Sequence, residues 1–200
     1  MRVAISASLK SAQDLQAIGW KLDAIGLPGV QFADVTGDGN CLYHSLGREI
    51  AAVAPTGFTI MGREPPPKTE PWPGMFWRSV LCESVRQQKD EAWADGRTVE
   101  DWVGTVANAT VTTYTAKHER DGEYGGFFEA ALLARALGSG WEFVIINARE
   151  APARIVAVAG ARGEGHNFLI GAAWRGNHWQ RARFTEQGRQ AVRAWQSRNQ

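Results

Sequence analysis

The order of the hydrophobic patterns along the chain is the feature that most restricts its fold. Apart from one short strand pattern near residue 30, the apolar residues up to Gly138 recur at helical spacing. From Trp141 onward they fall in short runs rich in β-branched and aromatic residues. Helices first and adjoining strands later favour an α+β fold over a doubly wound sheet. We therefore expect a β-sheet packed between helical layers.

The same patterns define the expected elements. Helices are expected at Ser11–Ile25, from about Cys41, and at about 75–94, 98–116, Phe127–Leu137 and Glu186–Gln196. In the helix that begins at about Cys41, the residues expected to face the core are Leu42, Leu46, Ile50 and Val53. Strands are expected at Val30–Val35, Trp141–Asn147, Arg154–Ala159, Asn167–Trp174 and His178–Phe184. A proline-rich segment at about 54–74 is expected to be a surface loop. Two hundred residues suit one well-cored domain, so residues 1–200 are expected to form a single domain.

Composition excludes several classes of partner. A formal net charge of +1 provides no long-range field for nucleic acid or an anionic membrane. No stretch approaches the roughly 20 apolar residues of a membrane span. Cys41 and Cys82 are too few for a disulfide framework or a metal set, and they suit a reducing, cytoplasmic compartment. We expect a monomer without metal, cofactor, nucleic acid or membrane contact.

One cysteine occupies a position that favours reactivity. Cys41 follows the tight, glycine-containing sequence Thr36–Asn40 and begins a predicted helix. The positive end of a helix and its free N–H groups lower the pKa of a thiol placed there. The amides of Gly39, Asn40 and Cys41 are expected to form an oxyanion hole. The alternative is that Cys41 is a small buried apolar residue at a helix start.

A nucleophilic thiol needs a base, and the chain has four histidines. His44 lies one helical turn beyond the cysteine and is expected to be a packing residue or to support residues of the site. His118 lies in a charged stretch and is expected to be exposed, whereas His166 has no neighbour of a type that would orient it. His178 opens a strand after a tight turn, with Gln180 two residues later on the same face. His178 is therefore the predicted base.

The imidazole also needs a group that orients it. The carboxamide of Gln180 can accept a hydrogen bond from one ring nitrogen and turn the other toward sulfur. Asn177 and Asp38 are rival candidates. The alternative for His178 itself is an ordinary hydrogen-bonded histidine at a strand edge.

Three blocks of the sequence resemble those of the ovarian-tumour (OTU) family. Asp38–Tyr43 is similar to the nucleophile block, Asp-Gly-x-Cys followed by an apolar and an aromatic residue. Tyr124–Gly126, followed by a helix and a core strand, resembles the second block. Asn177–Trp179 resembles the third, a histidine followed by an aromatic residue. The blocks occur in family order and span most of the chain.

This resemblance implies a papain-like OTU cysteine protease fold with a central, mostly antiparallel sheet. It implies a deubiquitinase that acts on ubiquitin or polyubiquitin, with Cys41 as nucleophile and His178 as base. Tyr124, Gly125, Gly126 and Trp179 are the implied substrate-binding residues. Many family members carry Asp or Asn two positions after the histidine, where this chain has Gln180, so the third catalytic member stays open.

Other functions fit the same residues. One is an OTU-fold protease for a ubiquitin-like modifier or a polyprotein, and another is an inactive ubiquitin-binding module. The abundance of alanine, glycine, arginine and tryptophan is typical of a GC-rich bacterial gene. A bacterial or viral member of the family would be expected to act as an effector secreted into a host cytosol, where ubiquitin occurs.

Overall fold

The computed structural model describes residues 27–64, 74–93, 95–149, 151–161, 163–164 and 167–199. The expected helix at Ser11–Ile25, the later part of the proline-rich loop and His166 lie outside this range. Nothing in the described part tests whether residues 1–200 form one domain, and that remains a prediction.

Within the described residues, five strands form a single mixed sheet. They are β1 (Val30–Ala33), β2 (Trp141–Asn147), β3 (Arg154–Ala161), β4 (Phe168–Trp174) and β5 (Trp179–Phe184). Their order across the sheet is β1-β5-β4-β2-β3, and only the β2–β4 pair is parallel. The expected mostly antiparallel sheet is confirmed.

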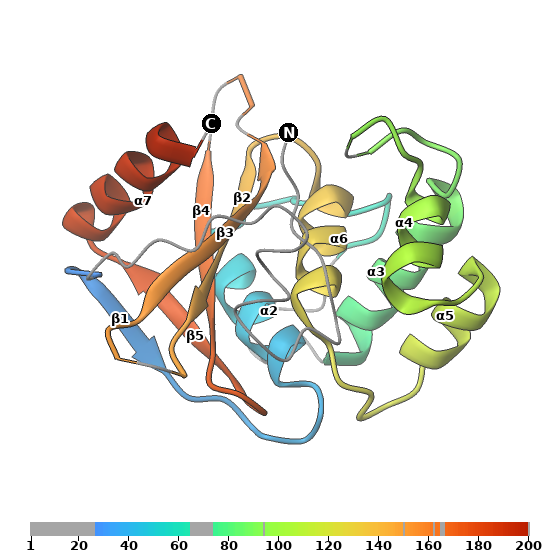
Figure 1. Ribbon diagram of the computed structural model, residues 1–200, viewed down its shortest axis with the longest axis horizontal. Helices are drawn as coiled ribbons and strands as arrows, with labels where there is room; N and C mark the ends of the chain where they lie inside the picture. Colours follow the sequence, from blue (N-terminus) through green and yellow to red (C-terminus); the bar gives the residue numbers. More distant parts are fainter. Residues whose placement is uncertain are drawn as a thin grey trace.

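Helices cover both faces of this sheet. They are α2 (Cys41–Val53), α3 (Gly74–Gln87), α4 (Val99–Ala107), α5 (Val111–His118), α6 (Phe127–Leu137) and α7 (Glu186–Asn199). In Figure 1, α7 lies on one side of the sheet, α2 and α6 on the other, and α3, α4 and α5 form a further layer beyond them. The α+β architecture with helical layers is thus confirmed.

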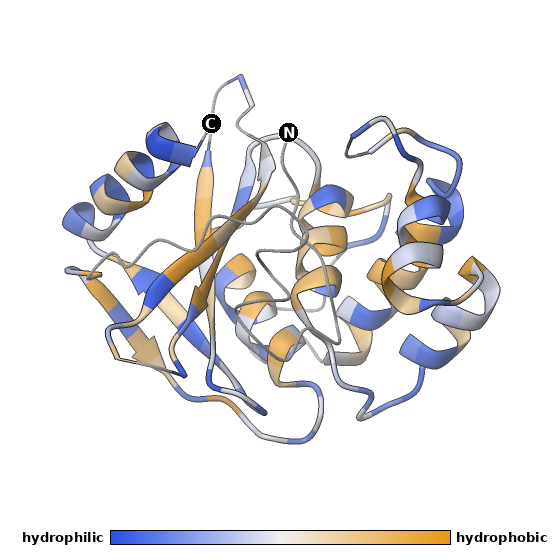
Figure 2. Cartoon of the chain, viewed as in Figure 1, coloured by the Kyte–Doolittle hydropathy of each residue, from blue (hydrophilic) through white to orange (hydrophobic). Residues whose placement is uncertain are grey.

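The central strand β2 explains why both faces need a helical cover. Phe143 and Ile145 belong to the larger core, between the sheet and the helices on the side of α2 and α6. Val144 and Ile146 point the other way, into a smaller core that includes Trp195 of α7. A strand buried on both faces carries consecutive apolar residues, as Phe143–Ile146 do in β2, and Figure 2 shows orange, hydrophobic segments within the central strands.

Two predicted helices were wrong in extent. The helix expected at 98–116 is two helices, because Asn108 adopts the left-handed conformation (φ 48°, ψ 47°) and the Thr110 side chain then caps α5. Asparagine tolerates that conformation better than most residues. The helix expected at 75–94 ends at Gln87, after which the chain turns back.

One predicted core position was also wrong. Val53 lies in the last turn of α2 and is 36% exposed, because the helix ends there, at the edge of the packed region. Among the described residues, no helix is both long and apolar enough to span a bilayer.

Candidate active site

Cys41 is the first residue of α2 and is 2% exposed. It follows a turn in which the backbone N–H of Asn40 donates to Oδ1 of Asp38 at 2.9 Å. The carbonyl of Asn40 accepts from the N–H of His44, also at 2.9 Å. The strand-turn-helix placement predicted for the cysteine is therefore present.

Glycine is required at position 39 of this turn. Its φ is +82°, a conformation in which side chains are strained. A side-chain carbon at this position would also collide with the carbonyl of Gly122. The turn before Cys41 is thus packed directly against the loop before α6.

His178 lies just before β5, and its ring is held by a carboxylate. The Nε2 atom of His178 is 2.6 Å from Oδ1 of Asp34, and this hydrogen bond lowers the pKa of the Asp34 carboxyl. The opposite edge of the ring faces Gly37, the first residue of the turn before Cys41 (the cysteine turn, residues 37–40), since a carbon added to Gly37 would lie 3.6 Å from Nδ1. Nε2 is therefore engaged by Asp34, and Nδ1 is turned toward the segment that leads to Cys41.

The sheet register brings Asp34 and His178 together. β1 and β5 are antiparallel, with Ala33 opposite Arg181. The chain leaving β1 therefore runs beside the chain entering β5, which places Asp34 next to the residues just before Arg181. α2 packs on β5, so Cys41 reaches the same end of the sheet.

The sulfur of Cys41 touches the start of β5. Burial raises the pKa of the thiol, and hydrogen bonds from the backbone N–H groups of Trp179 and Leu42 lower it by less. The net shift is upward, so the expectation of a lowered pKa is not met in the free protein. The contact with Trp179 places the sulfur beside His178, the preceding residue.

The residue that orients His178 was missed at the sequence level. Asp38 instead binds His44, with Oδ2 3.0 Å from Nε2. Gln180 donates from Nε2 to Oδ1 of Asp34 at 3.5 Å rather than contacting the imidazole. Asn177 is exposed and, in the described part of the chain, makes no hydrogen bond to the ring. The structure corrects the candidate orienter to Asp34.

The sequence contains one weak indication that Asp34 belongs to the site, namely its position at the end of a short strand pattern. The strand predicted at Val30–Val35 placed Asp34 inside a strand, whereas β1 ends at Ala33. An acidic residue directly after a short strand is a candidate for a site at the strand end. Choosing it required knowing which strand pairs with β1.

The turn geometry reduces the predicted oxyanion-hole donors from three amides to two. The amide of Asn40 already donates to Asp38, and it is not free for a substrate oxygen in this arrangement. The amides of Gly39 and Cys41 remain as candidate donors. The amide of Cys41 belongs to the first residue of α2, where a helix leaves its N–H groups without an internal partner.

The predicted substrate-binding block lies at the same end of the molecule. Trp179 is fully buried, and its indole N–H donates to the carbonyl of Gly125 at 2.9 Å. The N–H of Gly126 donates to Glu129 at 2.7 Å. Tyr124 accepts from the indole of Trp174 at 3.0 Å, and burial raises its pKa to about 12. Trp179 thus fixes the backbone of Gly125 through this hydrogen bond.

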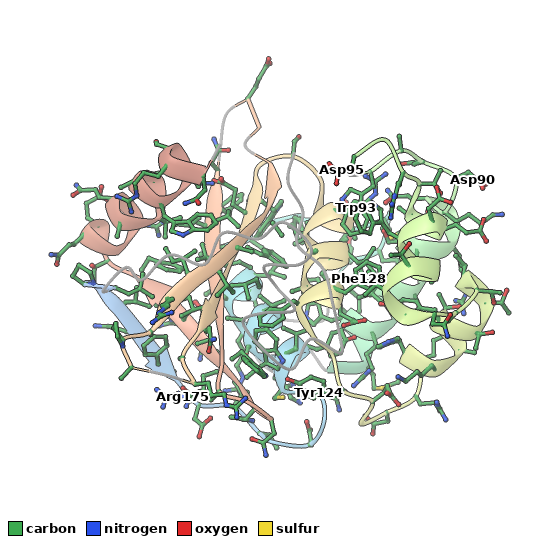
Figure 3. All side chains as sticks on the ribbon, in the orientation of Figure 1. Asp90, Trp93, Asp95, Tyr124, Phe128 and Arg175 are labelled. Atoms are coloured by element: carbon green, nitrogen blue, oxygen red, sulfur yellow. The ribbon has the colours of Figure 1, made fainter. Side chains whose placement is uncertain are left out.

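Figure 3 shows Tyr124 and Arg175 on either side of this end of the molecule. Tyr124 precedes α6, and Arg175 lies in the turn between β4 and β5. The turn that carries His178 and the block that precedes α6 therefore flank the N-terminus of α2. No cluster of three or more His, Cys, Asp or Glu side chains suited to a metal occurs within the described ranges.

His118 and Cys82 are both buried outside the site, although His118 was expected to be exposed. His118 is 2% exposed rather than exposed, because α5 turns it inward against Glu129, whose Oε1 lies 3.4 Å from Nε2. Burial lowers its pKa. Cys82 lies fully buried in α3, with its sulfur 3.6 Å from the carbonyl of Thr115 and its pKa raised to about 12. Neither lies in the site.

Comparisons with known proteins identify the fold. No family model and no curated protein matches the chain. Solved structures do match it. The viral OTU domain protease from Taggert virus aligns over 84% of this chain and 88% of its own, with a TM-score of 0.56 and 15% identity.

Two further structures agree. The viral OTU domain protease from Dera Ghazi Khan virus aligns over 84% of this chain and 96% of its own, with a TM-score of 0.52 and 14% identity. An OTU domain solved in complex with ubiquitin covers 78% of this chain and 71% of its own, with a TM-score of 0.51 and 13% identity. The protein has the OTU fold.

Proposed function

We propose that the protein is a deubiquitinase that hydrolyses the peptide or isopeptide bond after the C-terminal Gly-Gly of ubiquitin. The observation that carries the proposal is the meeting of Cys41, His178 and Asp34 at one end of an OTU fold. A thiol, an imidazole and a carboxylate in this order form the constellation of cysteine hydrolases. The ubiquitin complex of a protein with the same fold supports the choice of substrate.

We assign a catalytic role to each group on the basis of this geometry. Nδ1 of His178 takes the proton of the Cys41 thiol as sulfur attacks the carbonyl carbon of the terminal glycine. The N–H groups of Cys41 and Gly39 stabilise the oxyanion of the tetrahedral intermediate. His178 returns the proton to the leaving lysine amine, and a thioester remains. Water, deprotonated by His178, then releases the ubiquitin carboxylate and the free thiol.

Burial of the thiol favours an acyl donor without side chains. Cys41 is 2% exposed, and Gly125 and Gly126 are buried nearby. A di-glycine tail can approach such a sulfur atom more closely than any tail with side chains. We also propose that the protein acts in a host cytosol, a proposal supported by its composition and by the viral origin of two of its structural neighbours.

The test is reaction with ubiquitin that carries an electrophile at its C-terminus. Wild-type protein is expected to gain the mass of one ubiquitin, with the adduct on Cys41 in a peptide map. Cys41→Ala is the matched control, and Cys82→Ala should label as the wild type does. Probes built on ubiquitin-like modifiers run beside the ubiquitin probe and measure selectivity.

Other outcomes separate the alternatives. Labelling by a ubiquitin-like probe alone would replace ubiquitin as the substrate. Ubiquitin binding, measured by calorimetry, without labelling or turnover would identify an inactive binding module. An adduct on Cys82 instead of Cys41 would overturn the site.

A further inference from the structure

Arg78 of α3 is a fully buried cation whose hydrogen bonds end on two loops of the site. Its Nε donates to Oδ1 of Asn40 at 2.5 Å, and its Nη2 donates to the carbonyl of Gly39 at 3.0 Å. On the other side, Nη1 donates to the carbonyl of His118 at 3.2 Å, and Nη2 also donates to the carbonyl of Glu123. Arg78 therefore joins the cysteine turn to the loop before α6.

Removing the charged guanidinium of Arg78 from water is energetically unfavourable. Among the described residues, the hydrogen-bond acceptors of Arg78 are neutral oxygens, and the guanidinium also stacks 4.4 Å from the ring centre of Tyr43. Burying a charge without a carboxylate partner carries a large desolvation penalty, which these hydrogen bonds must offset. A planar guanidinium satisfies several divergent acceptors at once, which an ammonium on a flexible stem does not. The site thus contains an arginine-specific contact.

The contact immobilises the peptide between Gly39 and Asn40. Its carbonyl accepts from Arg78, and its N–H donates to Asp38. The peptide plane is therefore held from both sides. The N–H of Gly39, one candidate oxyanion donor, belongs to the residue so fixed.

The Asn40 side chain is held in the same way. Its Oδ1 accepts from Arg78, and its Nδ2 donates to Oδ1 of Asp121 at 2.8 Å. Asn40 in turn precedes Cys41, and its carbonyl accepts from His44. The direction of the Cys41 N–H, the other candidate donor, depends on this residue.

We propose that Arg78 and Asp121 are positioning residues that hold the oxyanion donors of the cysteine turn in place. The inference rests on the proposed acyl-transfer function and adds to it two residues distant in sequence. Neither is assigned a contact with the substrate. Both act through Asn40, and Arg78 also acts through Gly39.

Asp121 provides the cleaner test, because it is exposed and its replacement leaves the core intact. Asp121→Ala is expected to lower kcat for a ubiquitin–fluorophore substrate by about tenfold, a fraction of the 10²–10³ attributed to loss of a whole oxyanion donor. KM should change less than twofold. Asp121→Asn keeps an oxygen acceptor for Asn40 and should restore most of the lost rate. Asp90→Ala removes an exposed carboxylate far from Tyr124 (Figure 3) and is the matched control.

Two further measurements separate positioning from general damage. Ubiquitin aldehyde forms a hemithioacetal that uses the oxyanion donors, so its inhibition constant should rise in parallel with the fall in kcat. Alkylation of Cys41 by iodoacetamide forms no oxyanion, and its rate should stay within twofold of wild type. Arg78→Lys should show the same pattern with a larger loss in kcat, provided that its circular dichroism and melting match the wild type. If Arg78→Lys does not fold, the comparison of Asp121→Ala with Asp121→Asn tests the inference.

The outcomes that overturn the inference are distinct. Unchanged kcat in Asp121→Ala, or equal losses in turnover and alkylation, would show that the contacts do not position the donors. Failure of Asp121→Asn to recover activity would have the same meaning. Absence of turnover in the wild type would overturn the proposed function, and this inference with it.

Discussion

The Nε2 atom of His178 lies 2.6 Å from Oδ1 of Asp34, a residue 144 positions earlier in the chain. An ionised carboxylate only accepts hydrogen bonds, so Nε2 carries the proton. Nδ1 is then the basic nitrogen of the neutral ring, and it faces Gly37 and the cysteine turn. Asp34 therefore selects the tautomer that the proposed proton transfer from Cys41 requires.

Replacement of Asp34 tests this assignment. Asp34→Ala should lower kcat/KM for a ubiquitin–fluorophore substrate by about 10²–10⁴-fold, because the wrong tautomer and ring orientation become accessible. Thermal stability should be unchanged, since the side chain is 72% exposed. Gln180→Ala should cost less than tenfold, because its contact reaches the carboxylate at 3.5 Å and not the imidazole. A silent Asp34→Ala beside a crippling Asp38→Ala or Asn177→Ala would refute the assignment.

The two cysteines should differ in their response to pH. Burial raises the pKa of Cys41 above its usual value, so the fraction of thiolate, and with it the rate of iodoacetamide labelling, should rise as the pH increases beyond neutrality. The pKa of Cys82 is raised further, to about 12, and native protein should remain unlabelled there. Peptide mapping by mass spectrometry after timed labelling measures both. A labelling rate for Cys41 that is flat from pH 6 to 9 would contradict the raised pKa.

Glu49 should be important for stability. This buried carboxylate of α2 binds Nε of Arg181 at 2.5 Å and Nε of Arg183 at 3.1 Å, and it ties the helix of Cys41 to the strand that follows His178. Glu49→Ala should lower the free energy of unfolding by about 3 kcal/mol, because the partly buried Arg181 loses its counter-charge. Arg183→Ala, whose side chain is 55% exposed, should lower it by less than about 1 kcal/mol. Urea unfolding distinguishes the two, and equal effects would contradict the prediction.

The start of α4 offers a test of a helix cap. Oγ1 of Thr98 accepts from the N–H of Asp101 at 3.1 Å, while Oδ2 of Asp101 accepts from the N–H of Thr98 at 2.9 Å. Thr98→Ala should lower the free energy of unfolding by about 1 kcal/mol. Thr112→Ala, at an exposed position within α5, is the control and should lower it little or not at all.

The same cap has a pH dependence of known sign. Its hydrogen bonds lower the pKa of Asp101 below the ordinary value of 3.8. The ionised carboxylate therefore stabilises the fold above that value, and the stabilisation is lost as the pH falls through the lower pKa of the folded state. The stability difference between wild type and Asp101→Asn should accordingly shrink below about pH 4. A difference that grows on acidification would contradict this sign.

Local sequence patterns were sufficient to predict most helices and strands and the turn before Cys41. The helix Phe127–Leu137 and the strand Trp141–Asn147 were predicted with the bounds they have, because hydrophobic periodicity and flanking glycines act over neighbouring residues. The placement of Cys41 at the start of a helix followed from the same local rules. The bounds of the helix predicted at 98–116 did not follow from these rules, because the break at Asn108 depends on a single backbone conformation.

The packing of the elements against one another determines which groups meet around Cys41. Asp34 reaches His178 because β1 pairs with β5 in one register, and a shift of one residue would turn its side chain to the other face. Arg78 reaches Asn40 because α3 packs beside α2. Contacts between segments far apart in sequence leave no periodic signal, since they arise from the packing of whole elements. The proposed nucleophile and base could therefore be chosen from the sequence, whereas Asp34 and Arg78 could not.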